Sequence, residues 1–155
     1  MDASTLTLQE GMHHWLFNVL LLSSKQKSAS FEKHENNYRN YIENRTIGCI
    51  KIQNSNSGPF QDYYNELYKK GIDLVNPHTK NKMHTSVSSA KIFDLNKTIR
   101  AFFTWCIKMH YTLDNPCTLK NIDIPRKCWW RGRWSRRIRL CYSGFWWFRN
   151  QINNI

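Results

Sequence analysis

Apolar residues recur at helical spacing in four stretches of the chain, and polar segments separate these stretches. The first stretch is preceded by Thr7-Leu8-Gln9-Glu10, in which a hydroxyl and a carboxylate are spaced as in a capping box. We therefore expect a helix to start at Thr7. The residues of its apolar stripe, which we expect to face a core, are Leu8, Met12, Trp15, Leu16, Val19 and Leu22.

A second helix is predicted over about residues 30–44, and a third after Gly58-Pro59, where proline suits the first helical position. Gly71 suits the end of the third helix. The apolar faces of these two helices consist of Phe31, Tyr38, Tyr41 and Ile42, and of Phe60, Tyr63, Tyr64 and Leu67. Between these two helices, apolar and polar residues alternate weakly over residues 47–52. We interpret them as an extended connector, with a short strand as the alternative, because no partner strand is visible.

Residues 72–88 have no helical period, and we read them as a long loop, with a small hairpin as the alternative. Loops of this length are often functional. A fourth helix is predicted over about residues 89–111, and its wide apolar face indicates the central helix. That face consists of Ile92, Leu95, Ile99, Phe102, Phe103, Cys106 and Ile107. Asn115-Pro116 prevents the helix from continuing, and residues 122–125 indicate an extended exit.

The predicted fold class is all-α, a four-helix bundle with short and medium loops. We place one domain over residues 1–127 and an irregular, basic, Trp-rich tail over residues 128–155. Phe102, Phe103 and Trp105 have the chemistry to stack on bases, but their helical context favours burial.

Charge is distributed unevenly along the chain. The formal net charge is +12 and the pI is about 9.7. Residues 126–155 hold no acid and contribute +8, whereas residues 1–125 contribute +4. Such an excess of positive charge indicates a polyanionic partner.

The five cysteines are odd in number and include no C-x-x-C pair, which argues against a zinc site or a disulfide framework. Reduced thiols in a cytoplasm are the simpler interpretation. The apolar run 15–22 is too short to span a bilayer, and the segment before it lacks the basic residues of a signal peptide. No Gly-rich phosphate loop is present, and we expect no cofactor and no metal.

The order of these motifs resembles the N-terminal core-binding (SAM-like) domain of phage-type tyrosine recombinases over about residues 5–127. The similarity is greatest to integrases of low-GC Gram-positive bacteria and their mobile elements. The residues that carry it are Phe102, Phe103, Trp105, Cys106, Tyr111, Asn115, Pro116, Ile122, Ile124 and Pro125. Two features depart from the family pattern. The segment 72–88 is longer than usual, and the catalytic domain expected soon after Pro125 is missing.

The resemblance implies DNA recombination or integration as the ancestral activity, with double-stranded DNA as the partner. In this family the core-binding and catalytic domains clamp a duplex between them. Lysine and asparagine side chains can neutralise and hydrogen-bond phosphates, and helix N-termini offer free amides to the same anions. An ordinary solvated lysine is the alternative at each position. The candidate DNA-binding residues are Lys25, Lys27, Ser28, Lys80, Lys82, Lys91, Lys97 and Arg100. An intact integrase is a further candidate partner; a membrane and a small-molecule substrate are not expected.

The family's chemistry requires a tyrosine nucleophile, two arginines on the scissile phosphate and a His-x-x-Arg element. No histidine follows Pro125, and Tyr142 is the one tyrosine beyond it. We therefore predict a truncated recombinase that is not an enzyme and that does not cleave DNA by itself.

The tail holds five of the seven tryptophans. Its base usage also changes, from twelve lysines and three arginines before Arg126 to one lysine and seven arginines from there on. A nucleic-acid- or membrane-binding arm, a short packed helix and an out-of-frame translation are the three interpretations, and we favour the last. Two other functions stay open. One is a stand-alone regulatory DNA-binding protein with a functional tail, and the other is a helical protein-interaction module.

Overall fold

A computed structural model of the chain describes residues 5–23, 28–75 and 79–125. These residues are mostly helical, which confirms the predicted fold class, and they add one small two-stranded sheet. In chain order, the elements are α1 (Leu8–His14), the π-helix η1 (Trp15–Leu20), α2 (Ser28–Tyr41), the 3-10 helix η2 (Thr46–Cys49), α3 (Ser57–Lys70), β1 (Ile72–Val75), β2 (Lys82–Thr85) and α4 (Ser89–Lys108).

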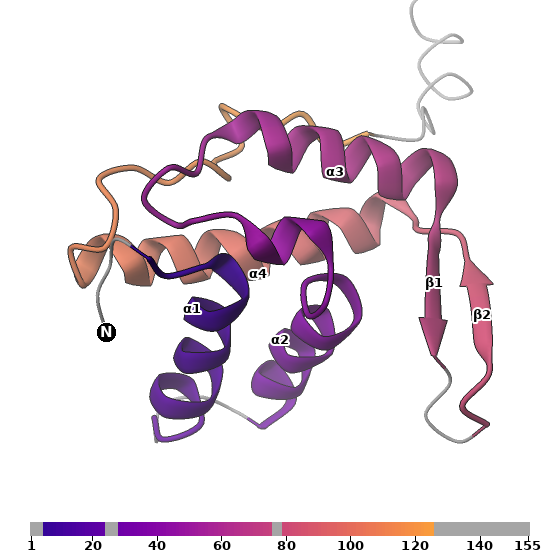
Figure 1. Ribbon diagram of the computed structural model, residues 1–155, viewed down its shortest axis with the longest axis horizontal. Coiled ribbons are helices and arrows are strands. Elements are labelled where there is room, and N and C mark those ends of the chain that lie inside the picture. Colours follow the sequence, from indigo (N-terminus) through magenta and orange to yellow (C-terminus); the bar gives the residue numbers. More distant parts are fainter. Residues whose placement is uncertain (1–4, 24–27, 76–78, 126–155) are drawn as a thin grey trace, which may run out of the picture. The chain divides into compact units, whose positions relative to one another are not determined.

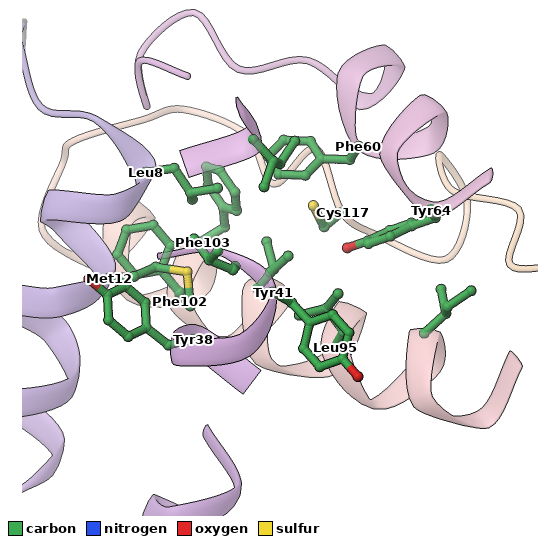
Figure 2. Close-up of a cluster of buried hydrophobic side chains, with 14 of the residues drawn as sticks. Leu8, Met12, Tyr38, Tyr41, Phe60, Tyr64, Leu95, Phe102, Phe103 and Cys117 are labelled. Atoms are coloured by element: carbon green, nitrogen blue, oxygen red, sulfur yellow. The ribbon is translucent and has the colours of Figure 1, made fainter. Parts of the chain in front are cut away.

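Helix α4 is the central helix, as its wide apolar face predicted. In Figure 1 it runs between α3 on one side and α1 and α2 on the other. Phe102 and Phe103 are fully buried, with ring centroids 5.4 Å apart, and each ring packs against a different helix. Phe102 packs edge-on against Trp15 and Phe103 packs edge-on against Phe60 (Figure 2 shows the surrounding cluster). These adjacent rings therefore join two parts of the fold in one core.

The first helix begins as predicted and then departs from α-geometry. Thr7 is its N-cap, and Glu10 completes the capping box. From Trp15 the chain winds as a π-helix, in which the Leu21 amide donates to the Leu16 carbonyl. The wider turn shifts the apolar stripe, so the prediction that Leu22 faces the core is wrong. Its side chain is 77% exposed.

Two predicted boundaries around α2 are also corrected. The helix covers residues 28–41 rather than 30–44, and it is followed by the left-handed residue Asn44 (φ 57°). Residues 47–52 form no named strand, as expected, but they start inside a 3-10 turn. They also have a partner that the sequence did not reveal. The Leu8 amide donates to the Ile50 carbonyl, and the Ile52 amide donates to the Leu6 carbonyl.

Helix α3 starts at Ser57 with Asn56 as N-cap, which places Pro59 at the third helical position rather than the first. It ends at Gly71, as predicted. Residues 72–75 and 82–85 then form the hairpin that was the alternative to a loop, with β1 antiparallel to β2. Helix α4 ends three residues earlier than predicted, at Lys108.

After α4 the chain forms no further helix or strand up to residue 125, where the described part ends, in agreement with the expected extended exit. Ile122 and Ile124 are buried in the same core. Within the described ranges, no helix is both long and apolar enough to cross a membrane.

Candidate nucleic-acid interface

One face of α4 carries three cationic residues and a threonine. Lys97, Arg100, Thr104 and Lys108 follow each other at steps of three or four residues, so they share one side of the helix. Arg100 is half-buried and the other three are exposed. The sequence contains no acidic residue from 95 to 113. We call these four residues the α4 basic stripe.

The segment after α4 is hydrogen-bonded to the helix beside this stripe. The side-chain nitrogen of Asn115 (Nδ2) donates to the Arg100 carbonyl over 3.0 Å and contacts the Thr104 hydroxyl at 3.4 Å. The Asn115 side-chain oxygen accepts from the Cys117 amide at 3.0 Å, which forms a local turn. Asn115 therefore fixes the returning chain against the helix while the cationic side chains stay at the surface.

Lys97 has an aromatic neighbour within the same helix. Its ammonium lies 4.7 Å from the centroid of the Phe93 ring, one turn earlier. A cation over an aromatic face is stabilised by the ring quadrupole without losing its charge. The ammonium is thus oriented along α4 and remains accessible to an anion, since Lys97 is exposed.

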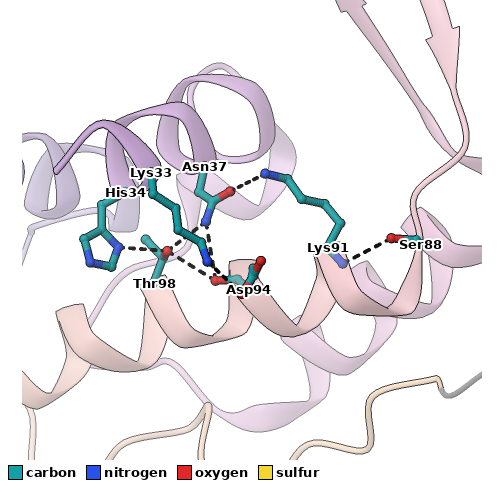
Figure 3. A network of polar contacts seen from close by, with 7 residues as sticks. All are labelled: Lys33, His34, Asn37, Ser88, Lys91, Asp94 and Thr98. Atoms are coloured by element: carbon teal, nitrogen blue, oxygen red, sulfur yellow. Dashed lines mark hydrogen bonds and ion pairs between the residues drawn. The ribbon is translucent and has the colours of Figure 1, made fainter. Parts of the chain in front are cut away.

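A polar network holds α2 against α4 (Figure 3). Its centre is Asn37, which is fully buried. The side-chain nitrogen of Asn37 (Nδ2) donates to the Thr98 hydroxyl at 2.9 Å and lies 3.4 Å from the Asp94 carbonyl. The Asn37 side-chain oxygen accepts from the Lys91 ammonium at 2.8 Å. The network therefore sets how α2 lies on the helix that carries the stripe.

His34 joins this network from α2. Its Nδ1 lies 3.0 Å from the Thr98 hydroxyl, whose own hydrogen goes to the Asp94 carbonyl. The contact therefore requires the hydrogen of His34 on Nδ1. Burial, with a smaller contribution from the charge of Lys33, lowers the pKa of His34, so the ring is neutral at pH 7.

The carboxylate of α4 is neutralised locally. Asp94 is paired with Lys33 of α2 at 2.9 Å. The pair is partly exposed, so it contributes little to stability. Its electrostatic effect is of more interest, because it removes most of the one negative charge on α4 that would repel a phosphate.

The predicted site residues fall into separate places. Lys97 and Arg100 lie together on the α4 basic stripe. Lys80 and Lys82 are exposed on the hairpin that precedes α4. Lys25 and Lys27 lie outside the described residues.

Two of the predicted residues have intramolecular partners. Ser28 is the first residue of α2 rather than a residue before it, and its hydroxyl donates to the Glu32 carboxylate at 3.1 Å. Lys91 donates to Asn37 and lies 5.3 Å from the Tyr41 ring centroid. Lys91 is thus held between α2 and α4.

Sequence reasoning missed Lys108 and Thr104 as surface partners of Lys97. Helical spacing contained the signal, since Lys108 lies eleven residues after Lys97, close to three full turns. It also missed the buried polar residues Asn37 and Thr98. No pattern in the sequence distinguishes these from surface polar residues.

Comparisons with known proteins add one finding. No family model matches the chain, and no solved structure matches it. A curated protein described as "Tyrosine recombinase XerC-like", from Caldanaerobacter subterraneus subsp. tengcongensis, is 38% identical over 125 residues. The match covers 81% of this chain and 28% of the relative. Over four fifths of its length the chain is therefore similar to part of a tyrosine recombinase, and it spans less than a third of that relative.

Proposed function

We propose that this chain binds double-stranded DNA through the α4 basic stripe and does not cleave it. The observation that carries the proposal is the stripe itself, in which two exposed lysines and a half-buried arginine share one acid-free side of α4 in a chain that is similar to part of a tyrosine recombinase. Residues 1–127 would then act as a core-binding domain, and an intact integrase stays a second candidate partner.

The dimensions of the stripe suit a phosphate backbone. Lys97 and Lys108 are eleven residues apart, which at the rise of an α-helix corresponds to about 16 Å. One DNA strand carries a phosphate roughly every 3.4 Å along the duplex axis. The stripe therefore faces roughly five phosphates of one strand. Contacts of this kind favour binding to any duplex, with weak sequence selectivity.

The residue content of the chain supports the proposal that it does not cleave DNA. All six histidines lie between His13 and His110, and Tyr142 is the one tyrosine after Pro125. The chain spans less than a third of the length of the relative that it matches. A tyrosine nucleophile with its arginine and histidine partners is therefore not part of the function that we propose.

Salt-dependent gel retardation of a labelled 30-base-pair duplex tests the proposal. Each phosphate contact steepens the slope of log K against log salt by about 0.9. Replacing Lys97 and Lys108 by alanine should therefore make the slope shallower by about 1.8. The matched control is the double variant Lys51→Ala/Lys120→Ala, in which two exposed lysines away from α4 are removed. Binding that is insensitive to salt, or equal losses in both double variants, would count against the stripe.

Removing residues 128–155 separates this proposal from a regulator with a functional tail. We expect the shortened chain to unfold at a similar temperature and to keep its salt-dependent binding. A regulator that binds through its arginine-rich tail predicts that affinity collapses when the tail is removed, because residues 128–155 hold six arginines and no acid and so contribute +6 of the net charge.

A further inference from the structure

The β1–β2 hairpin is held firmly at its base. Ile72 and Val87, on either side of it in the chain, are buried in the core. The Arg45 guanidinium donates to the Asp73 carbonyl over 2.7 Å. Gly71 takes a φ of +73°, and a Cβ there would lie 2.6 Å from the Thr85 carbonyl oxygen. The direction in which the hairpin leaves the helical core is therefore fixed.

The far half of the hairpin is uncovered. Val75 pairs with Lys82, and Leu74 pairs with Met83. Paired residues share a face, so Val75 and Met83 point to opposite faces of the ribbon. Their side chains are 59% and 57% exposed, and among the described residues no other strand joins the sheet. Each face of the ribbon therefore presents an apolar side chain to solvent near its free end.

The charge of the hairpin is positive at that same end. Lys80 and Lys82 are exposed there, and the sequence has no acidic residue between Asp73 and Asp94. Asp73 lies at the base, where its carboxylate is 2.8 Å from His84 Nδ1. An exposed ribbon with cations at its free end is complementary to a polyanion rather than to an apolar protein surface.

We propose that the β1–β2 hairpin enters the major groove of the bound duplex. Its two strands are about 5 Å apart, and the major groove is about 12 Å wide, which admits a two-stranded ribbon. Lys80 and Lys82 contact phosphates at the groove edge. Met83 or Val75, depending on which face is turned inward, contacts the thymine methyl groups.

This inference rests on the proposed duplex binding. It adds which groove of the DNA is contacted and which element of the protein contacts it. A β-strand of another protein could instead pair with a free edge of the hairpin. Exposed lysines on a short strand oppose such edge pairing, whereas they favour a nucleic acid.

Photo-crosslinking to the major groove tests the inference with the full chain. The probe is a 30-base-pair random-sequence duplex in which 5-iodouracil replaces thymine, so that iodine occupies the position of the thymine methyl group. After irradiation and digestion with trypsin, we expect a crosslink in peptide 83–91, which contains Met83 and His84, or in peptide 71–80, which contains Val75, according to the face that is turned inward. Crosslinks that fall only outside residues 72–88 would overturn the inference.

The Lys80→Ala/Lys82→Ala double variant provides the second arm. Because trypsin no longer cleaves after residues 80 and 82 in this variant, the corresponding peptide is 71–91. We expect the salt slope of the variant to be shallower by about 1.8 and its crosslink within residues 71–91 to be lost, while Lys51→Ala/Lys120→Ala keeps the crosslink at the hairpin. Equal behaviour of the two double variants would also overturn groove entry. If the unaltered chain binds no duplex at low salt, the proposed function fails as well. If it binds but does not crosslink through the hairpin, groove entry alone fails.

Discussion

Replacing Asn37 by alanine is the most direct test of how α2 is held on α4. The side chain is fully buried and makes three polar contacts, to the Thr98 hydroxyl, the Asp94 carbonyl and the Lys91 ammonium. Alanine removes all three at once. It also leaves the Lys91 ammonium, which belongs to a half-buried residue, without its protein acceptor.

The size of the effect can be estimated from these contacts. A hydrogen bond to a charged group contributes about 1.5–3 kcal/mol, and a neutral one about 1 kcal/mol. The contact to the Asp94 carbonyl is long, at 3.4 Å, and is counted as negligible. The sum is about 3 kcal/mol, which for a folded part of this size lowers the melting temperature by roughly 10 °C.

Urea and thermal unfolding, followed by far-ultraviolet circular dichroism, measure this loss. The matched control is Asn36→Ala, which removes an exposed asparagine at the neighbouring position of the same helix and should cost less than about 0.5 kcal/mol. A double-mutant cycle of Asn37→Ala with Lys91→Ala should give a coupling energy of about 1–3 kcal/mol. If Asn37→Ala and Asn36→Ala are equally stable, the network does not hold the two helices together.

Three further predictions concern other parts of the fold. Gly71→Ala should lower the free energy of unfolding by roughly 1–3 kcal/mol, because alanine is strained at φ +73° and its Cβ would meet the Thr85 carbonyl; chemical denaturation measures it. Burial lowers the pKa of His34 from its ordinary 6.5, so the folded chain binds that proton more weakly than the unfolded chain. The contribution of neutral His34 to stability is therefore present above about pH 6.5 and is lost as the pH falls. The difference in urea midpoint between pH 7.5 and pH 5.5 should be smaller in His34→Gln than in the unaltered chain. Iodoacetamide at pH 8 should modify Cys49, which is exposed, far faster than Cys106, because burial raises the pKa of Cys106 to about 12; peptide mass spectrometry gives both rates.

Each of these has its own control. Gly58→Ala should be close to neutral, because Gly58 lies in the first turn of α3 without a left-handed φ. His13→Gln is the matched histidine replacement at an exposed position, and it is measured beside His34→Gln. An equal pH dependence in His34→Gln and the unaltered chain would refute the argument from burial. Equal alkylation rates for the two thiols in the folded chain would contradict the burial of Cys106.

The sequence by itself determined the helical elements and most of the core. Of the seven residues predicted for the apolar face of α4, Ile107 is half-buried and the other six are buried. Those six are Ile92, Leu95, Ile99, Phe102, Phe103 and Cys106. The capping box at Thr7 and the end of α3 at Gly71 were also predicted. These features depend on local spacing and on backbone conformations that few residue types adopt, so neighbouring residues carry the whole signal.

Features that depend on residues distant in the sequence were not predictable in the same way. The π-helical turn after Trp15 moves Leu22 away from the core, and the connector 47–52 pairs with Leu6 and Leu8. Neither has a local signature, because the first changes the period of the helix and the second pairs segments about 40 residues apart.

The candidate interface shows the same division. Composition and the order of the motifs indicated a DNA partner and placed Lys97 and Arg100 among the candidates. The tertiary structure decided that Lys91 is held between two helices by Asn37, and that Lys33 neutralises Asp94. A lysine in the sequence carries the same charge in either setting. Whether that charge reaches a partner or stays within the chain depends on which side chains the fold brings within about 3 Å of it, the reach of a hydrogen bond.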